Sequence, residues 1–581
     1  KSTCMRLFDF LPSNNMNGRL FLLINLLLTL TTFSQNSSVY PQTYFQKPLE
    51  IPIILSGTFG ELRSNHFHSG MDIKTQQREG FKVFAAADGY VSRINIQEGG
   101  YGKALYIAHP NGYTSVYAHL QKFGPEIEAY IKAEQYKKES YTIERFPGKD
   151  ELIVKGGQII AYSGNTGGSS GPHLHFEIRD GNQRPMNPML FGFKLPDAQF
   201  PEFAGLYAYP LNDSSHVNQY HQRTKLRLIN NGNGHYTTES VEASGEIAFG
   251  IDAFDRLDQA ANKNGLVCIE TKINGQQNFL IDFNKFSFDE TKHVNRLIDY
   301  EYFRTSKRRL QLLYQKTNNP LSLYKNIVNK GRLTVEPNQN IVYQIIITDF
   351  NGNASSITVP INHAPALSVP NTNDSFSEII ISQNQSMTIN ESNCSIYFPK
   401  NCFYDDIPIS VEYDNDTLRI IGPEAAAQKS FAITFDTSQY TTQDRKHLLI
   451  ASVWGKNRKM YPVYTNREGN NLRAYAKVFG NYTLTEDRTP PTIEPENFKS
   501  GQWMSKFRYL KLKIADDFSG VSGYRATING KWILMEYESK TGMLTYDFND
   551  EAIKESEHKL IVVVTDNVGN STTFESVFYR Q

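Results

Sequence analysis

Cysteine is scarce in this sequence, with four residues in a chain of 581. This scarcity excludes a disulfide-dense scaffold and a zinc site built mainly on thiolates, so a metal would have to bind histidine and carboxylate side chains. An excess of charge is also missing, because 60 Lys and Arg residues balance 60 Asp and Glu residues. A general binder of nucleic acids or anionic membranes needs a basic excess, and the sequence argues against that class of function.

Long apolar runs are scarce as well. The block Leu20–Phe33 follows Met16 and Arg19 and precedes Ser34, and it is shorter than the about 20 residues of a membrane-spanning helix. A positive charge, a short apolar block and a small residue predict a secretory signal peptide, with an uncleaved N-terminal anchor as the alternative. We therefore expect residues 1–34 to be removed, no membrane span to remain, and the chain to work in the periplasm, the cell envelope or outside the cell.

Aromatic residues are abundant, at 12% of the chain with 33 Tyr and 36 Phe, and they favour β structure. We expect a mainly β protein with an antiparallel sheet unit at 37–200, followed by about three β-sandwich modules. The expected modules occupy residues 235–365, 370–487 and 490–581. The first unit contains an insertion at about 121–152, whose segment 126–136 has apolar residues at the spacing of one helix face.

A repeat appears in the chain after residue 200. The sequence IDAFD at 251–255 and the sequence IADDF at 514–518 are each followed by an ING turn and later by a β-branched run that ends in TDxxGN. Asp and Asn that bond their own backbone, next to a Gly that tolerates positive φ, are typical of hairpins. These modules resemble bacterial immunoglobulin-like domains. Between them, Cys394 and Cys402 could form a hairpin disulfide in an exported chain, and the spacing leaves this open.

Histidines cluster early in the chain, with six of the thirteen between residues 66 and 175. In the sequence HSGMD, His68 and Asp72 could converge on one ion if the chain turns at Gly70. A surface loop is the alternative for this motif. His66 is expected to be exposed and His109, in an HPNG turn, to be structural.

The sequence SSGPHLHFEIR, at 169–179, alternates polar and apolar residues as a half-buried strand does. Its period of two places His173 and His175 on one face, while Glu177 is expected at the polar edge of the strand. The preceding loop lacks the Lys-Ser/Thr end of a phosphate-binding loop, which excludes a nucleotide site. In TSVYAHL, at 114–120, His119 is expected to project from a sheet face.

Taken together and in this order, HFHSGMDI, YAHL and GNTGGSSGPHLHFEIR resemble the lysostaphin/LytM-type zinc metallopeptidases of bacterial cell walls. The flanking sequences FGELR, ADGYV and VKGGQIIAYSGNTG also match, and the resemblance covers about residues 50–185. It implies that His68, Asp72 and His175 bind one Zn²⁺. It also implies that His119 and His173 are the unliganded catalytic pair, with the division of roles between them open.

The resemblance implies an exported zinc metalloendopeptidase that hydrolyses peptide bonds in peptidoglycan cross-links or stem peptides through a zinc-activated water. Two alternatives stay open: a non-catalytic cell-wall-binding or regulatory protein of the same fold, and a secreted protease that acts on proteins. The β modules would position the catalytic domain or bind the wall, a cell-envelope protein or the cleft itself.

Overall fold

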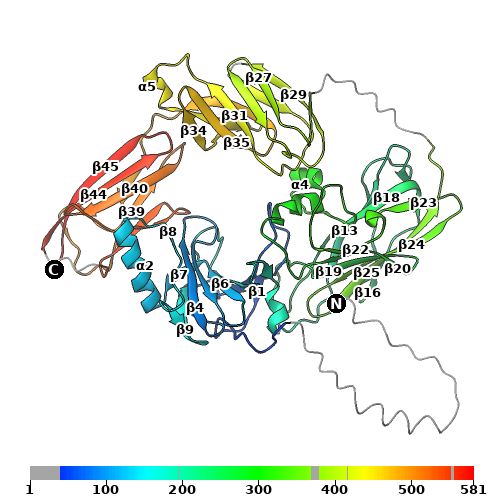
Figure 1. The fold of residues 1–581 in the computed structure, drawn as a ribbon, viewed down its shortest axis with the longest axis horizontal. Helices are drawn as coiled ribbons and strands as arrows, with labels where there is room; N and C mark the ends of the chain where they lie inside the picture. The colour runs from blue at the N-terminus through cyan, green and yellow to red at the C-terminus, as the bar shows by residue number, and fades with distance from the viewer. Residues whose placement is uncertain (1–39, 194, 368–378, 415, 551–554) are drawn as a thin grey trace, which may run out of the picture.

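The computed structural model describes residues 40–193, 195–367, 379–414, 416–550 and 555–581, so the predicted signal peptide lies outside the described residues. In this part of the chain the protein is mainly β, with antiparallel sheets, as predicted. An N-terminal domain is followed by three β modules, defined as module 1 (202–363), module 2 (379–486) and module 3 (492–581). The chain closes into a ring in which module 3 lies beside the N-terminal domain (Figure 1).

The N-terminal domain is built on a nine-stranded sheet with a smaller three-stranded sheet against it. The central order β1-β2-β11-β6-β5-β4-β8 is formed by Leu55–Gly57, Met71–Lys74, His173–Arg179, Thr114–Ala118, Lys103–Ala108, Gly89–Ile96 and Ile143–Arg145, with β9 (Ile153–Val154) and β12 (Pro185–Met186) at its margins. The small sheet consists of β3 (Lys82–Phe84), β10 (Ile159–Ser163) and β7 (Leu120–Phe123). Buried aliphatic and aromatic side chains of the domain, such as Ile73, Leu105, Ile160 and Phe176, form a single core cluster.

The insertion contains the predicted helix, α2 (Pro125–Lys138). Proline at its first turn suits the helix start, because that position needs no backbone N–H donor. Ile127 and Ile131 are buried on one face. After α2 the chain adds strands β8 and β9 to the large sheet, so the insertion extends the domain at its far edge from β1.

Module 1 contains a thirteen-stranded sheet. Its strands are β13 (Glu202–Pro210), β14 (His216–Val217), β15 (Thr224–Leu226), β16 (Ile229–Gly232), β17 (His235–Thr237), β18 (Val241–Phe254), β19 (Cys268–Ile273), β20 (Gln276–Asp282), β21 (Gln311–Leu312), β22 (Tyr324–Ile327), β23 (Leu333–Val335), β24 (Asn340–Thr348) and β25 (Ala354–His363). The sequence placed the start of this module at 235, whereas β13 already pairs with β18 along its length. The helical segments η2 (Pro188–Phe191), η3 (Thr291–His293), α3 (Val294–Leu297), α4 (Tyr300–Ser306) and η4 (Asn329–Gly331) connect these parts.

Modules 2 and 3 are each two sheets around a shared core. Module 2 has strands β26 (Ile379–Ile381), β27 (Met387–Glu391), β28 (Cys394–Phe398), β29 (Ile407–Asp414), β30 (Thr417–Ile421), β31 (Phe431–Asp436), β32 (Leu448–Trp454), β33 (Lys459–Pro462), β34 (Thr465–Glu468), β35 (Asn471–Ala476) and β36 (Gly480–Glu486), with the short α5 (Thr442–Arg445). Module 3 has β37 (Thr492–Pro495), β38 (Gln502–Trp503), β39 (Tyr509–Ala515), β40 (Val521–Ile528), β41 (Lys531–Trp532), β42 (Glu536–Glu538), β43 (Met543–Asp547), β44 (Glu557–Asp566) and β45 (Ser571–Tyr579).

The two cysteines of module 2 are both free and buried, so the hairpin disulfide that the sequence left open is absent from the structure. The reason is the register, because Cys394 lies opposite Glu391 and Phe435 and not opposite Cys402. The Cys402 thiol instead donates to the carbonyl of Lys429.

The ring is closed by ion pairs and apolar contacts between module 3 and the N-terminal domain. The ammonium group of Lys103, a residue only 3% exposed, lies 2.8 Å from Glu536. Leu534 joins the core cluster of the N-terminal domain, and Trp532 packs against Tyr136 of α2. Lys540 donates to backbone carbonyls of the glycine-rich loop, including that of Ser169 at 3.2 Å. Module 3 therefore supports the loop that leads into β11.

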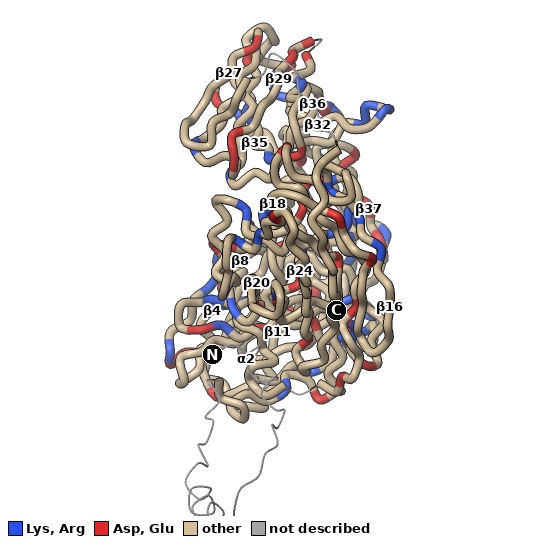
Figure 2. Tube along the Cα trace, turned by 90° about the vertical axis from the view of Figure 1, so that its right-hand side faces the viewer, with Lys and Arg blue, Asp and Glu red and all other residues tan. Residues whose placement is uncertain are grey.

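Charges of both signs are interspersed along the chain on the face seen in Figure 2, which agrees with the zero net charge. Among the described residues, no helix is long and apolar enough to cross a membrane.

Candidate metal centre

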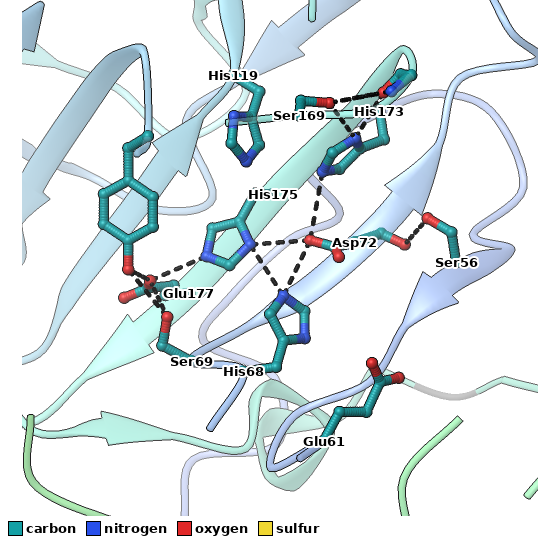
Figure 3. A network of polar contacts seen from close by, with 12 residues as sticks. Ser56, Glu61, His68, Ser69, Asp72, His119, Ser169, His173, His175 and Glu177 are labelled. Carbon is teal, nitrogen blue, oxygen red and sulfur yellow. Dashed lines mark hydrogen bonds and ion pairs between the residues drawn. The ribbon is translucent and has the colours of Figure 1, made fainter. Parts of the chain in front are cut away.

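Two adjacent strands bring the predicted ligands together. Asp72 on β2 lies directly opposite His175 on β11 in the antiparallel register, and His175 also faces Ala118 at the end of β6. His68 lies four residues before Asp72, in the segment that leads into β2. The three side chains converge although His175 is more than 100 residues away in sequence (Figure 3).

The converging atoms are spaced as ligands of one small cation are. Oδ1 of Asp72 lies 3.0 Å from Nε2 of His68 and 2.8 Å from Nδ1 of His175, and these two nitrogens are 3.1 Å apart. A tetrahedral Zn²⁺ with bonds of about 2.1 Å separates its ligands by about 3.4 Å, so a small widening would admit the ion. The three residues could thus hold a metal ion, and two imidazoles with one carboxylate suit zinc.

Hydrogen bonds on the far side of each imidazole orient the two histidines. Nδ1 of His68 donates to the carbonyl of Thr58 at 2.7 Å, which leaves Nε2 free for a metal. Nε2 of His175 donates to Glu177 at 2.9 Å, which leaves Nδ1 free. Carbonyl or carboxylate partners of this kind set the tautomer of metal-binding histidines.

The expectation that Glu177 lies at a polar edge is wrong. Its side chain is fully buried, and it accepts hydrogen bonds from His175, Ser69 and Arg179. The same period of two that aligns the histidines places Glu177 on their face. That face is covered by the chain around Ser69 and Tyr101 (Figure 3).

Asp72 is held through its second carboxylate oxygen. Arg63 lies 3.3 Å from Oδ2 of Asp72 and also pairs with Glu61, so the FGELR flank acts as a clamp on the ligand. Gly57 makes room for this arrangement, because a Cβ there would come within 2.5 Å of Arg63 and 2.7 Å of Asp72.

Glycine at position 70 serves close packing. Its φ is not positive, but a Cβ on Gly70 would lie 2.3 Å from the carbonyl oxygen of Phe176 on β11. The sequence correctly singled out this residue, because the chain bends at Gly70 as expected, and the close backbone approach is a second reason for glycine there.

The electrostatics of the three side chains favour a bound cation. Burial lowers the pKa of His175, but hydrogen bonds to Asp72 and Glu177 outweigh it and raise that pKa to about 9. Burial raises the pKa of Asp72, but the neighbouring histidines hold it well below its usual range. A site that attracts a proton so strongly between two carboxylates suits a metal ion, which competes with that proton.

His119 and His173 lie beside this group without belonging to it. Their rings are 4.7 Å apart. Nδ1 of His119 donates to the carbonyl of Thr166 and Nδ1 of His173 to that of Gly171, so Nε2 of His119 is left free, while Nε2 of His173 lies 3.4 Å from Oδ1 of Asp72 (Figure 3). Burial, together with repulsion from His175 and His173, lowers the pKa of His119 to about 3 and keeps its ring neutral.

The backbone at His119 differs from the expectation of a strand residue. His119 lies between the end of β6 and the start of β7, with a φ of 57°. This left-handed conformation is uncommon for residues other than glycine and tends to occur at functional sites. Its backbone N–H donates to the carbonyl of Tyr101, which fixes the turn.

No sequence pattern pointed to Tyr101, Ser69 or Ser169 as residues of the site. Tyr101 stacks on the ring of His175 at 5.3 Å and contacts Glu177, and Ser169 lies 3.1 Å from Nδ1 of His173. No local pattern marks Tyr101, since its partners lie far along the chain. His66 is exposed at the edge of the cleft, and His109 is buried and bonded to Ser115, as expected for a structural residue.

The five histidine and aspartate side chains line a cavity of about 1090 Å³. Module 1 forms part of its wall, through Phe288, Thr291 and Arg309. Thr291 accepts from the backbone N–H of Phe67, and Arg309 donates to Ser64. The cleft therefore lies in the N-terminal domain but is completed by a neighbouring module.

Comparison with known proteins agrees with this geometry. Residues 66–137 and 140–188 match Peptidase family M23. The chain is 34% identical over 136 residues to DD-carboxypeptidase/endopeptidase Mpg of Neisseria meningitidis, which covers 23% of this chain and 25% of that protein. It is 33% identical over 112 residues to lipoprotein NlpD of Yersinia enterocolitica, covering 19% of this chain and 90% of that protein. The chain belongs to Peptidase family M23, as the motifs predicted.

The chain spans about a quarter of the length of the first of these relatives. Among solved structures, the catalytic domain of lysostaphin from Staphylococcus simulans is 23% identical, with a TM-score of 0.19, and covers 24% of this chain and 93% of that domain. Residues 378–487 match a Zu5-like domain. Module 2 is therefore Zu5-like, where the sequence suggested an immunoglobulin-like pattern.

Proposed function

We propose that this chain is an exported, zinc-dependent endopeptidase that hydrolyses peptide bonds in peptidoglycan cross-links or stem peptides. The observation that carries the proposal is the convergence of His68, Asp72 and His175 in a cleft that His119 and His173 also face. Relatives named for peptidoglycan endopeptidase activity, such as ShyC of Vibrio cholerae, support the substrate class. The signal-type segment supports export.

The residues of the cleft would supply metal binding, proton transfer and stabilisation of the oxyanion. Zinc held by His68, Asp72 and His175 would activate water and polarise the scissile carbonyl. A neutral His119 with a free Nε2 can accept a proton from the attacking water. His173, whose Nδ1 donates to Gly171, can donate from Nε2 to the developing oxyanion when its ring carries a second proton, and the reverse assignment requires that second proton on His119. Lys74 and Arg309 in the cleft wall suit the free carboxylates of stem peptides.

Metal removal tests the proposal directly. Purified peptidoglycan is digested with the protein, and the products are identified by mass spectrometry with and without a zinc chelator. We expect cleaved peptide cross-links or stems only without the chelator, and recovery when zinc is restored. Unchanged peptidoglycan with a zinc-loaded protein would contradict the proposal, and release of products in excess chelator would contradict its metal dependence.

Substitution of the unliganded histidines separates catalysis from metal binding. His119→Ala and His173→Ala should each retain one zinc per chain while hydrolysis falls by about 10²–10⁴-fold, because a positioned acid or base is lost. Zinc content is measured by elemental analysis and hydrolysis on the same samples. His175→Ala, two residues further along β11, is the matched control and should lose the metal. A zinc-free His119→Ala protein would contradict the assignment.

A further inference from the structure

Three aspartates meet where the chain passes from the N-terminal domain into module 1. Asp197 lies between η2 and β13, Asp255 directly follows β18, and Asp349 directly follows β24. One carboxylate oxygen from each lies within 4.8 Å of the others. This group is separate from the candidate metal centre and plays no part in the function proposed above.

Two of these carboxylates have buried oxygens without a partner. Asp255 is only 2% exposed, and its Oδ1 accepts no hydrogen bond. Oδ2 of Asp197 is likewise buried and unpartnered. Among the described residues, no Lys or Arg forms an ion pair with any of the three aspartates, and a buried charge left in this way is costly.

Burial and repulsion between the carboxylates raise the pKa values of two of these aspartates. Burial, reinforced by the charges of Asp349 and Asp197, raises the pKa of Asp255 to about 8. Burial also raises the pKa of Asp349 to about 6, against hydrogen bonds from Asn353 that lower it. The three carboxyl groups thus lie together at this joint without a basic side chain to balance them.

The joint also has room for one ion. A small cavity of about 20 Å³ is lined by Asp197 and Asp255 together with Leu55 and Thr58 of the N-terminal domain. A cavity needs about 10–15 Å³ on this measure to hold a single water. The space therefore fits one monatomic ion and no larger ligand.

A second group of three aspartates lies just before and within module 3. Asp487 precedes its first strand, Asp516 directly follows β39, and Asp566 begins the TDNVGN turn, and these three also lie within 4.8 Å of one another. The amide of Asn570 donates to the carbonyl of Asp487, as the amide of Asn353 does to that of Asp197. Asp516 is less buried than Asp255, so the module 1 group is the stronger candidate.

We propose that Asp197, Asp255 and Asp349 bind a calcium ion at the joint between the N-terminal domain and module 1. All three donors are carboxylates, and hard oxygen ligands without imidazole or thiolate select Ca²⁺ or Mg²⁺ over zinc. Calcium accepts six to eight oxygen ligands in a flexible geometry, whereas Mg²⁺ requires a near-ideal octahedron, so three converging carboxylates from separate segments suit calcium better.

A calcium ion here would stiffen the joint next to the candidate metal centre. Asn264 pairs with Asp255 through two backbone hydrogen bonds. The next residue, Gly265, donates to the hydroxyl of Thr58, and the carbonyl of Thr58 accepts from His68. The ion site would thus be connected to His68 through the hydrogen bonds of Asn264, Gly265 and Thr58.

The test uses the full chain, freed of divalent ions and reloaded with one equivalent of zinc, and titrated with calcium chloride in a calorimeter. We expect calcium to bind and to raise the melting temperature by about 5 °C at saturating concentration. Asp255→Asn should bind one calcium fewer and lose this shift. In calcium-free buffer it should fold and melt no lower than the wild type, because asparagine is a neutral side chain of the same shape as the protonated carboxyl that it replaces.

Asp516→Asn is the matched control and should keep the calcium that Asp255→Asn loses. Magnesium chloride is titrated in parallel and should bind more weakly. The proposal is overturned if the wild-type protein binds no calcium, which would mean that protons neutralise the group. It is equally overturned if Asp255→Asn binds as many calcium ions as the wild type, or if magnesium binds more tightly than calcium.

Discussion

The Asp72→Ala protein is expected to lose its zinc and, with it, peptidoglycan hydrolysis. Asp72 is the residue on which the site converges, with His68 at 3.0 Å and His175 at 2.8 Å from the same oxygen. Loss of an outer-shell partner alone costs about 10–100-fold in metal affinity or activity, so loss of a ligand should cost more than about 100-fold. Zinc content and hydrolysis are measured on the same preparation.

Asp88→Ala is a suitable control for this substitution. Asp88 is also a carboxylate of the N-terminal domain, but its side chain is 58% exposed, and it pairs with the exposed Lys155 and accepts from the backbone N–H of Gly156. We expect wild-type zinc content and activity for this variant. An Asp72→Ala protein that cleaves purified peptidoglycan at the wild-type rate would show that the metal centre is assigned wrongly.

The Glu177→Gln protein is expected to be both less stable and poorer at holding zinc. Burial raises the pKa of Glu177, but Arg179 and His175 hold it well below its usual range, so the carboxylate is charged in the folded protein. Glutamine keeps the shape and removes the charge, which leaves the guanidinium of Arg179 buried without its partner. Breaking a buried pair in this way costs about 3–5 kcal/mol.

The effect of Glu177→Gln on the metal follows from its bond to His175. Zinc affinity should fall by about 10–100-fold, because the carboxylate orients the imidazole and raises its basicity. Denaturant unfolding of the metal-free protein and competition with a zinc-binding dye measure the two effects separately. Glu144→Gln breaks the exposed pair with Arg93 and should change stability by less than about 1 kcal/mol. Equal effects of the two variants would contradict a role for Glu177 in support of the metal site.

Much of the candidate site could be predicted because most of its metal-binding and catalytic residues belong to short sequence motifs. His68 and Asp72 are four residues apart, and His173 and His175 lie on one strand, so local spacing already limits their geometry. The strand period also placed Glu177 on the histidine face. Its burial could not be foreseen, because it depends on Ser69 and Tyr101, which reach the strand from distant loops.

The modules were harder to delimit than the site. The strand β13 has an ordinary alternating pattern, and only its pairing with β18 shows that module 1 starts before residue 235. The repeat of Asp and TDxxGN signals was visible in sequence, but we interpreted it as turn chemistry alone. That three such aspartates converge, two of them beside one small cavity, depends on how the domain joint packs.

The sequence by itself determined the β-rich class, the helix in the insertion, the family, and the choice of histidine and carboxylate over cysteine as the means of binding a metal. These properties depend on composition and on residues close together in the chain. The tertiary structure alone decided that Glu177 is buried and that Tyr101 stacks on His175. It also decided that module 1 lines part of the cleft, that module 3 contacts the glycine-rich loop, and that Lys103 is buried against Glu536. The physical reason is that burial and charge pairing depend on contacts between segments far apart in sequence, such as the 433 residues between Lys103 and Glu536, which no local pattern records.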